Sequence, residues 1–384
     1  MEKKVIQKKD WFANFTLIGR PKINEFSFKI DERSEKSNWI YNSMNLGVDC
    51  GESHGVIYSE LMGGYSEVNA NVIYAFGKRE EDAKESKQIV VAWDDRFNEE
   101  ILEQIDDMSF VSVGLERTDK GNLFVKKFLS AYDAIAYVKD HLTEDMVVNV
   151  KGTIKYSKYN DAVQVRKNIT SIVLSKVENP ADFKAAFTQS ILIDKDSASL
   201  KSIDKDKGVM YVDARVLDYV KEVNGIEVKG QYPYNKQFEF EMDFSNETQC
   251  KKIMDKLFKV KKGIDQITFE GEFIEGGAVV TATLADLPDD IKELVEMGVF
   301  TEEEACAKCT ANGSKERRMV LKKPLIRLVG DDKIPVIQRF ENRYEEEDLI
   351  LDYLYNESDK ANDTEDESNE ETTSDSGMDW LNSL

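Results

Sequence analysis

Residues 146–174 of the chain read MVVNVKGTIKYSKYNDAVQVRKNITSIVL. β-Branched and aromatic residues alternate with polar ones on both sides of Asn160 and Asp161, two residues that favour a turn. The pattern predicts a two-stranded hairpin. Gly152, near the middle of the first strand, permits the sharp bend that a small closed sheet requires. The stretch therefore predicts that this part of the chain folds into a β-barrel.

The residues before this hairpin complete the barrel pattern. Short alternating runs predict strands, and Ile135, Val138 and Leu142 recur at the spacing of a helix that ends before Asp145. A helix, a glycine-bent strand, a turn and a final strand are the usual ending of a five-stranded OB-like barrel. The early strands are expected at 11–19, 26–30, 39–48 and 55–62.

The second half of the chain repeats the same order of elements. Residues 190–207 are rich in Asp, Lys and Ser and predict a linker or a long surface loop. Asn246 is expected to cap a helix that Gly263 ends. Strands are predicted at 209–220, 236–243, 267–274 and 278–283, and a helical insert at 288–312.

The predicted fold is therefore mainly β with some α. It consists of tandem OB-like β-barrels with helical insertions, followed by a disordered acidic tail. We expect an OB-like nucleic-acid binding domain at residues 1–178, a second OB-like domain at 179–344, and the acidic tail with an apolar tip at 345–384.

The formal net charge of −22 is concentrated at the C-terminus. Residues 345–384 hold fifteen of the 74 acidic residues and one of the 52 basic residues, so this segment carries −14 and the rest of the chain −8. Binding to a polyanion depends on a local basic surface rather than on the total charge. An acidic protein can therefore still bind nucleic acid.

A local basic surface is present on the hairpin. Residues 146–176 hold six basic residues against one acidic residue, with two tyrosines between them. Cations that contact phosphates and rings that stack on bases are the two parts of a single-strand binding groove. The alternative is a solvated basic hairpin with core tyrosines. The candidate binding residues are Lys151, Lys155, Tyr156, Lys158, Tyr159, Arg166 and Lys167.

Two further rings lie on an earlier strand. Side chains of a strand alternate between faces, so Trp39 and Tyr41 share one face while Ile40 takes the other. This pair could present its rings outward together and bind bases. The alternative, and the favoured interpretation for either ring alone, is a core position.

The sequence argues against an enzyme. The chain has two histidines and lacks the glycine-rich phosphate-binding and nucleophile motifs of common hydrolases. Cys306 and Cys309 form a single C-x-x-C without the second ligand pair of a zinc site, so neither a metal nor a cofactor is expected. No apolar run is long enough to span a membrane, and we expect a cytoplasmic protein.

The C-terminus combines acidic residues with an apolar end. A disordered segment of this kind can dock its apolar residues on a partner protein. The candidate partner-binding residues are Asp379, Trp380, Leu381 and Leu384.

The hairpin Val147–Leu174 and the acidic tail that ends in Asp379, Trp380, Leu381 and Leu384 resemble bacteriophage single-stranded DNA-binding proteins of the OB-fold class. The segments 46–51 and 60–65 are similar to phage replication proteins. The resemblance implies sequence-independent binding of single-stranded DNA in phage DNA replication or recombination, in the host cytoplasm. It also implies that the tail recruits replication or recombination proteins. The alternative is a protein-interaction adaptor or scaffold of a replisome or virion.

Overall fold

The computed structural model describes residues 5–351 and 354. It leaves out 36, 80–85, 160–161, 206, 277–278, 281–290, 293–294, 296, 298–300, 302–304, 306–310, 313–315 and 331. The predicted turn at Asn160 and Asp161, most of the insert 288–312, Cys306, Cys309 and the tail tip lie outside the described residues. Every described helix is too short or too polar to cross a membrane.

The first half of the chain forms a closed five-stranded barrel, and the predicted fold class is confirmed. Strand β1 pairs with β3 and β9, β9 pairs with β10, and β4 pairs with β3 and with β10. The β4–β10 pairing is parallel and the other pairings are antiparallel, as expected for an OB-like barrel. The strands are β1 (Ala13–Lys22), β3 (Trp39–Asp49), β4 (Val56–Ser66), β9 (Val148–Tyr159) and β10 (Ala162–Leu174).

Alternating burial shows why these residues close a barrel. Leu17, Leu46 and Val150 are fully buried inside it, and their neighbours along each strand point outward. A Cβ atom at Gly152 would lie 1.9 Å from the carbonyl oxygen of Asn168, so only glycine permits this close approach of β9 and β10. The predicted role of this glycine in the bend agrees with the geometry.

The predicted helix is α2 (Ala131–His141), which lies between β4 and β9 in the chain. The Ser130 hydroxyl accepts a hydrogen bond from the backbone N–H of Tyr132 and caps the helix. Ile135 and Val138 face the barrel core. The remaining elements of the first half are β2 (Phe28–Arg33), β5 (Val72–Phe76), β6 (Gln88–Ala92), η1 (Trp93–Asp95), α1 (Glu99–Leu102), η2 (Asp107–Ser109), β7 (Val111–Arg117) and β8 (Leu123–Phe128).

The second half forms another ring of five strands. Strand β11 pairs with β13 and β15, β15 pairs with β18, and β14 pairs with β13 and, in parallel, with β18. Helix α3 (Glu247–Leu257) follows β14, with the Asn246 side chain capping it as predicted. The strands are β11 (Lys184–Ile193), β13 (Val209–Val223), β14 (Ile226–Glu241), β15 (Ile264–Gly276) and β18 (Glu316–Pro324). The domain bounds at residues 178 and 344 stay a prediction.

Two sequence predictions in this half are wrong. Residues 190–193 are not a linker but the end of β11, because Ile191, Leu192 and Ile193 are buried in the core. The strand that returns along β15 is β18; of the predicted strand 278–283 the structure describes Val279 and Val280, which pair with residues 311–312 instead. The chain between them contributes β16 (Val279–Val280) and β17 (Ala311–Asn312), which pair with each other. The other elements are η3 (Pro180–Asp182), η4 (Leu200–Ser202), β12 (Ile203–Asp204), β19 (Ile326–Val329), β20 (Ile334–Ile337) and β21 (Arg339–Tyr344).

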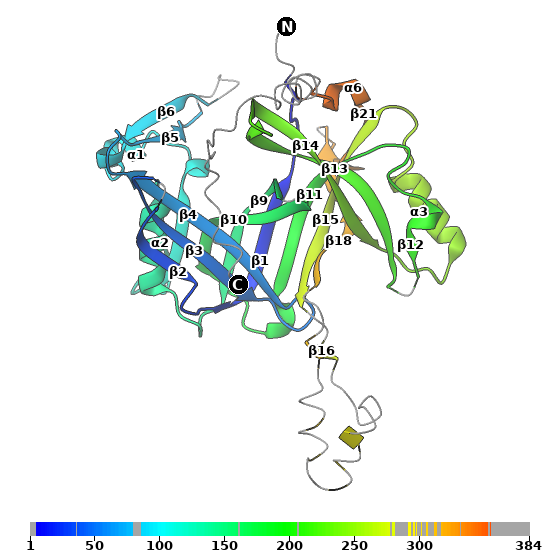
Figure 1. The fold of residues 1–384 in the computed structure, drawn as a ribbon, viewed down its shortest axis with the longest axis horizontal. Helices are drawn as coiled ribbons and strands as arrows, with labels where there is room; N and C mark the ends of the chain where they lie inside the picture. Colours follow the sequence, from blue (N-terminus) through cyan, green and yellow to red (C-terminus); the bar gives the residue numbers. More distant parts are fainter. Residues whose placement is uncertain are drawn as a thin grey trace, which may run out of the picture.

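The two barrels are joined by hydrogen bonds between one strand of each. Strand β1 of the first barrel pairs with β11 of the second along Ala13–Ile18, so the two rings form one continuous sheet (Figure 1). Asp218 of β13 adds a second link, because its buried carboxylate accepts a hydrogen bond of 2.6 Å from the backbone N–H of Tyr156 and lies 3.4 Å from the Lys155 ammonium.

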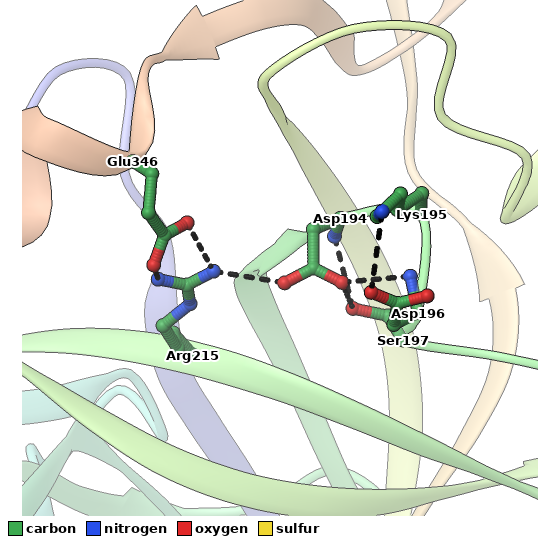
Figure 2. A network of polar contacts seen from close by, with 6 residues as sticks. All are labelled: Asp194, Lys195, Asp196, Ser197, Arg215 and Glu346. Atoms are coloured by element: carbon green, nitrogen blue, oxygen red, sulfur yellow. Dashed lines mark hydrogen bonds and ion pairs between the residues drawn. The ribbon is translucent and has the colours of Figure 1, made fainter.

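The chain after the second barrel begins with α6 (Glu346–Leu349). Arg215 holds this turn to the barrel: its Nη1 atom lies 2.6 Å from Glu346 Oε1, and its Nη2 atom lies 2.8 Å from Asp194 Oδ2 (Figure 2). Leu349 and Leu351 are buried in a small core. The predicted disordered tail therefore does not include residues 345–351, because these leucines have a core to fill.

Candidate nucleic-acid interface

The outer face of β3 and β4 is the candidate interface. These two strands run side by side across the first barrel (Figure 1). Met44 and Leu46 point into the barrel, so Trp39 and Tyr41 point outward on β3. On β4 the outward positions include Tyr58, Met62 and Gly64. In OB-like barrels this face, formed by the second and third barrel strands, is the usual site for oligonucleotides.

Three large side chains on this face are exposed to solvent. Trp39 is 38 % exposed, Tyr58 39 % and Met62 52 %. Tyr41 lies between them and is half-buried. Trp39 and Tyr41 were predicted to share a face, and the structure places both on this one. The face thus carries rings that a splayed base can reach.

A glycine shapes the surface beside Tyr58. Gly47 is the cross-strand partner of Tyr58, and a Cβ atom at Gly47 would lie 3.1 Å from Tyr58 Cε1. The tyrosine ring therefore lies over the bare backbone of β3. A side chain at position 47 would occupy the space that this ring uses.

A cation borders the rings on β10. Asn168 pairs with Glu60 of β4, and Arg166 is two residues before Asn168, so its side chain points to the same outer face. Glu60 lies between the rings and this arginine. Burial raises the pKa of the Glu60 carboxyl, and the positive charges of Arg166 and Lys167 oppose that shift. The face therefore combines stacking rings with the Arg166 cation and the Glu60 carboxyl, whose pKa is raised.

The predicted cations on β9 do not lie on the β3–β4 face. β9 lies between β1 and β10 in the ring and does not border β3 or β4. Lys151 and Lys155 point out of the barrel from β9, away from the β3–β4 face. Lys155 approaches Asp218 of the second barrel. Lys158 and Tyr159 are exposed near the end of the β9–β10 hairpin. The predicted residues therefore do not form a single groove.

Two predicted binding residues are wrong because they are buried. Tyr156 is 4 % exposed, and its hydroxyl donates a hydrogen bond of 2.9 Å to Gln189 Oε1, so its ring cannot stack on a base. The Lys167 ammonium is buried 2.8 Å from Glu275 Oε1 and 4.9 Å from the centre of the Phe273 ring. Both side chains fill the contact between the barrels.

Tyr58 and Met62 were not predicted as binding residues. Alternation along this stretch is visible in the sequence and places Val56, Tyr58 and Glu60 on the same face of a strand. What was missing was the pairing with β3, which brings Tyr58 opposite Gly47 and Met62 opposite Ser43. That pairing determines which alternate residues make one surface.

Other rings of the first half have structural roles. Tyr65, Trp93 and Tyr132 pack together with ring centres 5.1–5.9 Å apart. The Arg96 guanidinium lies 4.3 Å from the Trp93 ring and 2.8 Å from Asp133 Oδ2. These contacts attach the segment after β6 to α2.

The corresponding surface of the second barrel is different. There the cations of β18 are paired with acidic side chains: Arg318 with Glu239, and Lys322 with Glu241 and Glu272. Pairing cancels the local positive charge that phosphate binding requires. We take the first barrel as the candidate interface because Trp39, Tyr58 and Met62 are exposed together on its β3–β4 face.

The YorF family model matches residues 115–264, less than half of the chain. A solved deletion mutant of the single-stranded DNA binding protein from Thermus aquaticus is similar with a TM-score of 0.28 and 10% identity, over 69% of this chain and 87% of that chain. No curated protein matches.

Proposed function

We propose that the chain binds single-stranded DNA without sequence preference on the outer face of β3, β4 and β10, and that it has no catalytic role. The observation that carries the proposal is the set of exposed side chains Trp39, Tyr58 and Met62 on one barrel face, bordered by Arg166. The face is the one that OB-like barrels use for oligonucleotides. Arg166 would contact phosphates, and Lys158 and Tyr159 would extend the contact beyond the face.

Stacking explains why such a face binds any sequence. Every base has a flat apolar surface, and each base stacked on a ring contributes about 1–3 kcal/mol. The duplex hides these surfaces between base pairs, so a face of rings prefers a single strand. The modest number of cations beside the rings predicts a moderate salt dependence, with a slope of about −0.7 per phosphate contacted.

The experiment is a titration with fluorescently labelled oligo-dT at several salt concentrations. We expect saturable binding at low salt that weakens as salt is added, and weaker binding to duplex DNA. RNA of the same length, included in the series, identifies the preferred sugar. Absence of binding to oligo-dT at low salt would reject the proposal.

The acidity of Glu60 predicts a pH dependence. Its carboxylate repels phosphates when charged, and its pKa is raised. Binding should therefore strengthen as the pH falls toward that raised pKa. Glu60→Gln should bind more tightly at neutral pH by about 1 kcal/mol, or about fivefold, and should lose this part of the pH dependence.

The same shift has a consequence for stability. A carboxyl with a raised folded-state pKa contributes stability that is present below its unfolded pKa and is lost as the pH rises through the folded pKa. Unfolding curves at several pH values should show this loss in the wild type and not in Glu60→Gln. Equal pH dependence in both proteins would contradict the role assigned to Glu60.

We further propose that the protein acts in phage DNA replication or recombination, in the host cytoplasm, and that residues 356–384 recruit partner proteins. The acidic composition of this segment and its end at Asp379, Trp380, Leu381 and Leu384 support recruitment.

Deleting 356–384 should leave folding intact, abolish partner capture and strengthen binding to oligo-dT. Unchanged partner capture by the shortened protein would contradict this role. Binding of a protein partner but of no nucleic acid would favour the alternative function, an adaptor or scaffold.

A further inference from the structure

A row of side chains crosses the outer surface of the first barrel at the level of Tyr58. Asn168 of β10 pairs in parallel with Glu60 of β4. Two residues earlier on each strand, Arg166 is therefore level with Tyr58. Arg166 is in turn the cross-strand partner of Lys155 on β9, and cross-strand partners share one face of a sheet. A ring and two cations thus follow one another across β4, β10 and β9.

The row ends at the junction of the two barrels, where Lys155 meets Asp218 of β13. The Lys155 ammonium lies 3.4 Å from Asp218 Oδ1, which is longer than a charge-assisted hydrogen bond of about 2.7–2.9 Å. The Asp218 carboxylate also accepts hydrogen bonds from two backbone N–H groups, at 2.6 Å from Tyr156 and at 2.8 Å from Tyr219. The backbone therefore holds this carboxylate. The Lys155 side chain is 47% exposed, and its ammonium can donate to a further anion.

A second ammonium lies near the same carboxylate. Lys8 belongs to the segment before β1 (residues 5–12), which leads into β1 where the two barrels meet (Figure 1). Lys8 is half-buried, and its ammonium lies 5.6 Å from the centre of the Trp11 ring. Burial lowers the pKa of Lys8, the charge of Asp218 opposes that shift, and the charge of Lys155 adds to it. Two ammonium groups thus share one buried negative charge, and another anion would balance the remaining positive charge.

We propose that this junction is a second phosphate site, in which Lys8 and Lys155 hold a backbone phosphate of a nucleic-acid strand that has passed the rings of the β3–β4 face. The inference rests on the proposed function, because the row begins at Tyr58. It extends that function by giving the bound strand a path, from the rings past Arg166 to the edge of the second barrel. Every position of a strand offers a phosphate, so this site adds affinity without sequence preference.

A phosphate at the junction also acts on the segment before β1. Gln266 of the second barrel attaches this segment, because its Nε2 atom donates hydrogen bonds to the carbonyl oxygens of Lys9, at 3.1 Å, and Asp10, at 2.9 Å. A phosphate between Lys8 and Lys155 adds a link from the segment to β9 and offsets the repulsion between the two ammonium groups. Local opening of the segment should therefore become rarer when a long strand is bound.

The test is the affinity of the full chain for oligo-dT of about 4 to 16 nucleotides, the range of site sizes of one OB barrel. The shortest oligonucleotides cover the rings only, and longer ones reach the junction. Lys8→Gln combined with Lys155→Gln should bind the shortest oligonucleotides as the wild type does and should gain less affinity with length. For the longest oligonucleotide, the salt slope of this double variant should be smaller by about 0.7, the value for one phosphate contact of a single strand.

Lys151→Gln is the matched control. Lys151 is an exposed lysine on the same strand and the same outer face as Lys155, but its cross-strand partners are Thr16 and Ser171, outside the row. This variant should bind every length as the wild type does. Lys155→Arg keeps the charge and should keep the gain in affinity with length.

Amide hydrogen exchange provides a readout other than affinity. A long oligonucleotide should slow exchange in residues 5–12 of the wild type, whereas a short one should not. The double variant should show no such slowing. Its melting curve without DNA, compared with that of the wild type, shows that it is folded. If it does not fold, Lys155→Gln alone repeats the test at a half-exposed position.

The length series separates this inference from the proposed function. Wild-type binding of short oligo-dT, with the same gain in affinity with length in the double variant, would overturn the junction site and leave the β3–β4 face in place. An equal loss in Lys151→Gln would also overturn it, because the effect would then reflect overall charge. Failure of the wild type to bind oligo-dT of any length would reject both.

Discussion

Glu275→Ala is expected to lower the free energy of unfolding by about 3–5 kcal/mol, because it leaves the buried Lys167 charge without its partner. The Lys167 ammonium lies 2.8 Å from the Glu275 carboxylate, and the side chains are 8% and 10% exposed. The pair connects β10 of the first barrel with β15 of the second. Chemical denaturation of the variant and of the wild type measures the difference.

Two variants act as controls for this result. Lys167→Met combined with Glu275→Leu removes both charges and should be far less destabilising than Glu275→Ala. Glu270→Ala breaks an exposed ion pair with Lys323 and should cost less than about 1 kcal/mol. Equal losses for Glu270→Ala and Glu275→Ala would show that burial does not determine the effect. The double variant should also keep its affinity for oligo-dT, since Lys167 is not on the binding face.

Removal of the two exposed rings is expected to produce the largest loss of DNA affinity. Trp39→Ala and Tyr58→Ala should each weaken binding by about 1–3 kcal/mol, about 5- to 150-fold, because each removes one stacking surface. The double variant should lose more than either single variant. Fluorescence anisotropy of a labelled oligo-dT that accommodates one copy measures the affinity without relying on Trp39 emission.

The control is an exposed tyrosine on another surface. Tyr219 of β13 is more exposed than Tyr58, yet it lies in the second barrel, so Tyr219→Ala should leave the affinity unchanged. Trp39→Phe keeps a ring and should recover most of the binding lost in Trp39→Ala. If Trp39→Ala and Tyr58→Ala bind as the wild type does, the β3–β4 face is not the interface.

The sequence by itself determined the local elements. The β9–β10 hairpin, α2 and the capped helix α3 follow from patterns within about 30 residues, and such patterns depend on alternation, helical spacing and capping. Alternation also implies that Lys155 and Tyr156 point to opposite faces, which argues against one groove containing both. The order of elements in each half was sufficient to predict tandem OB-like barrels.

The tertiary structure alone decided which surfaces are covered. Glu60 and Asn168 are neighbours across β4 and β10, although more than a hundred residues separate them in the chain. Packing of the second barrel buries Tyr156 and Lys167 and leaves Trp39 and Tyr58 exposed. A sequence pattern reports which residues alternate, whereas the distant strands that pair with them decide which of the two faces meets solvent.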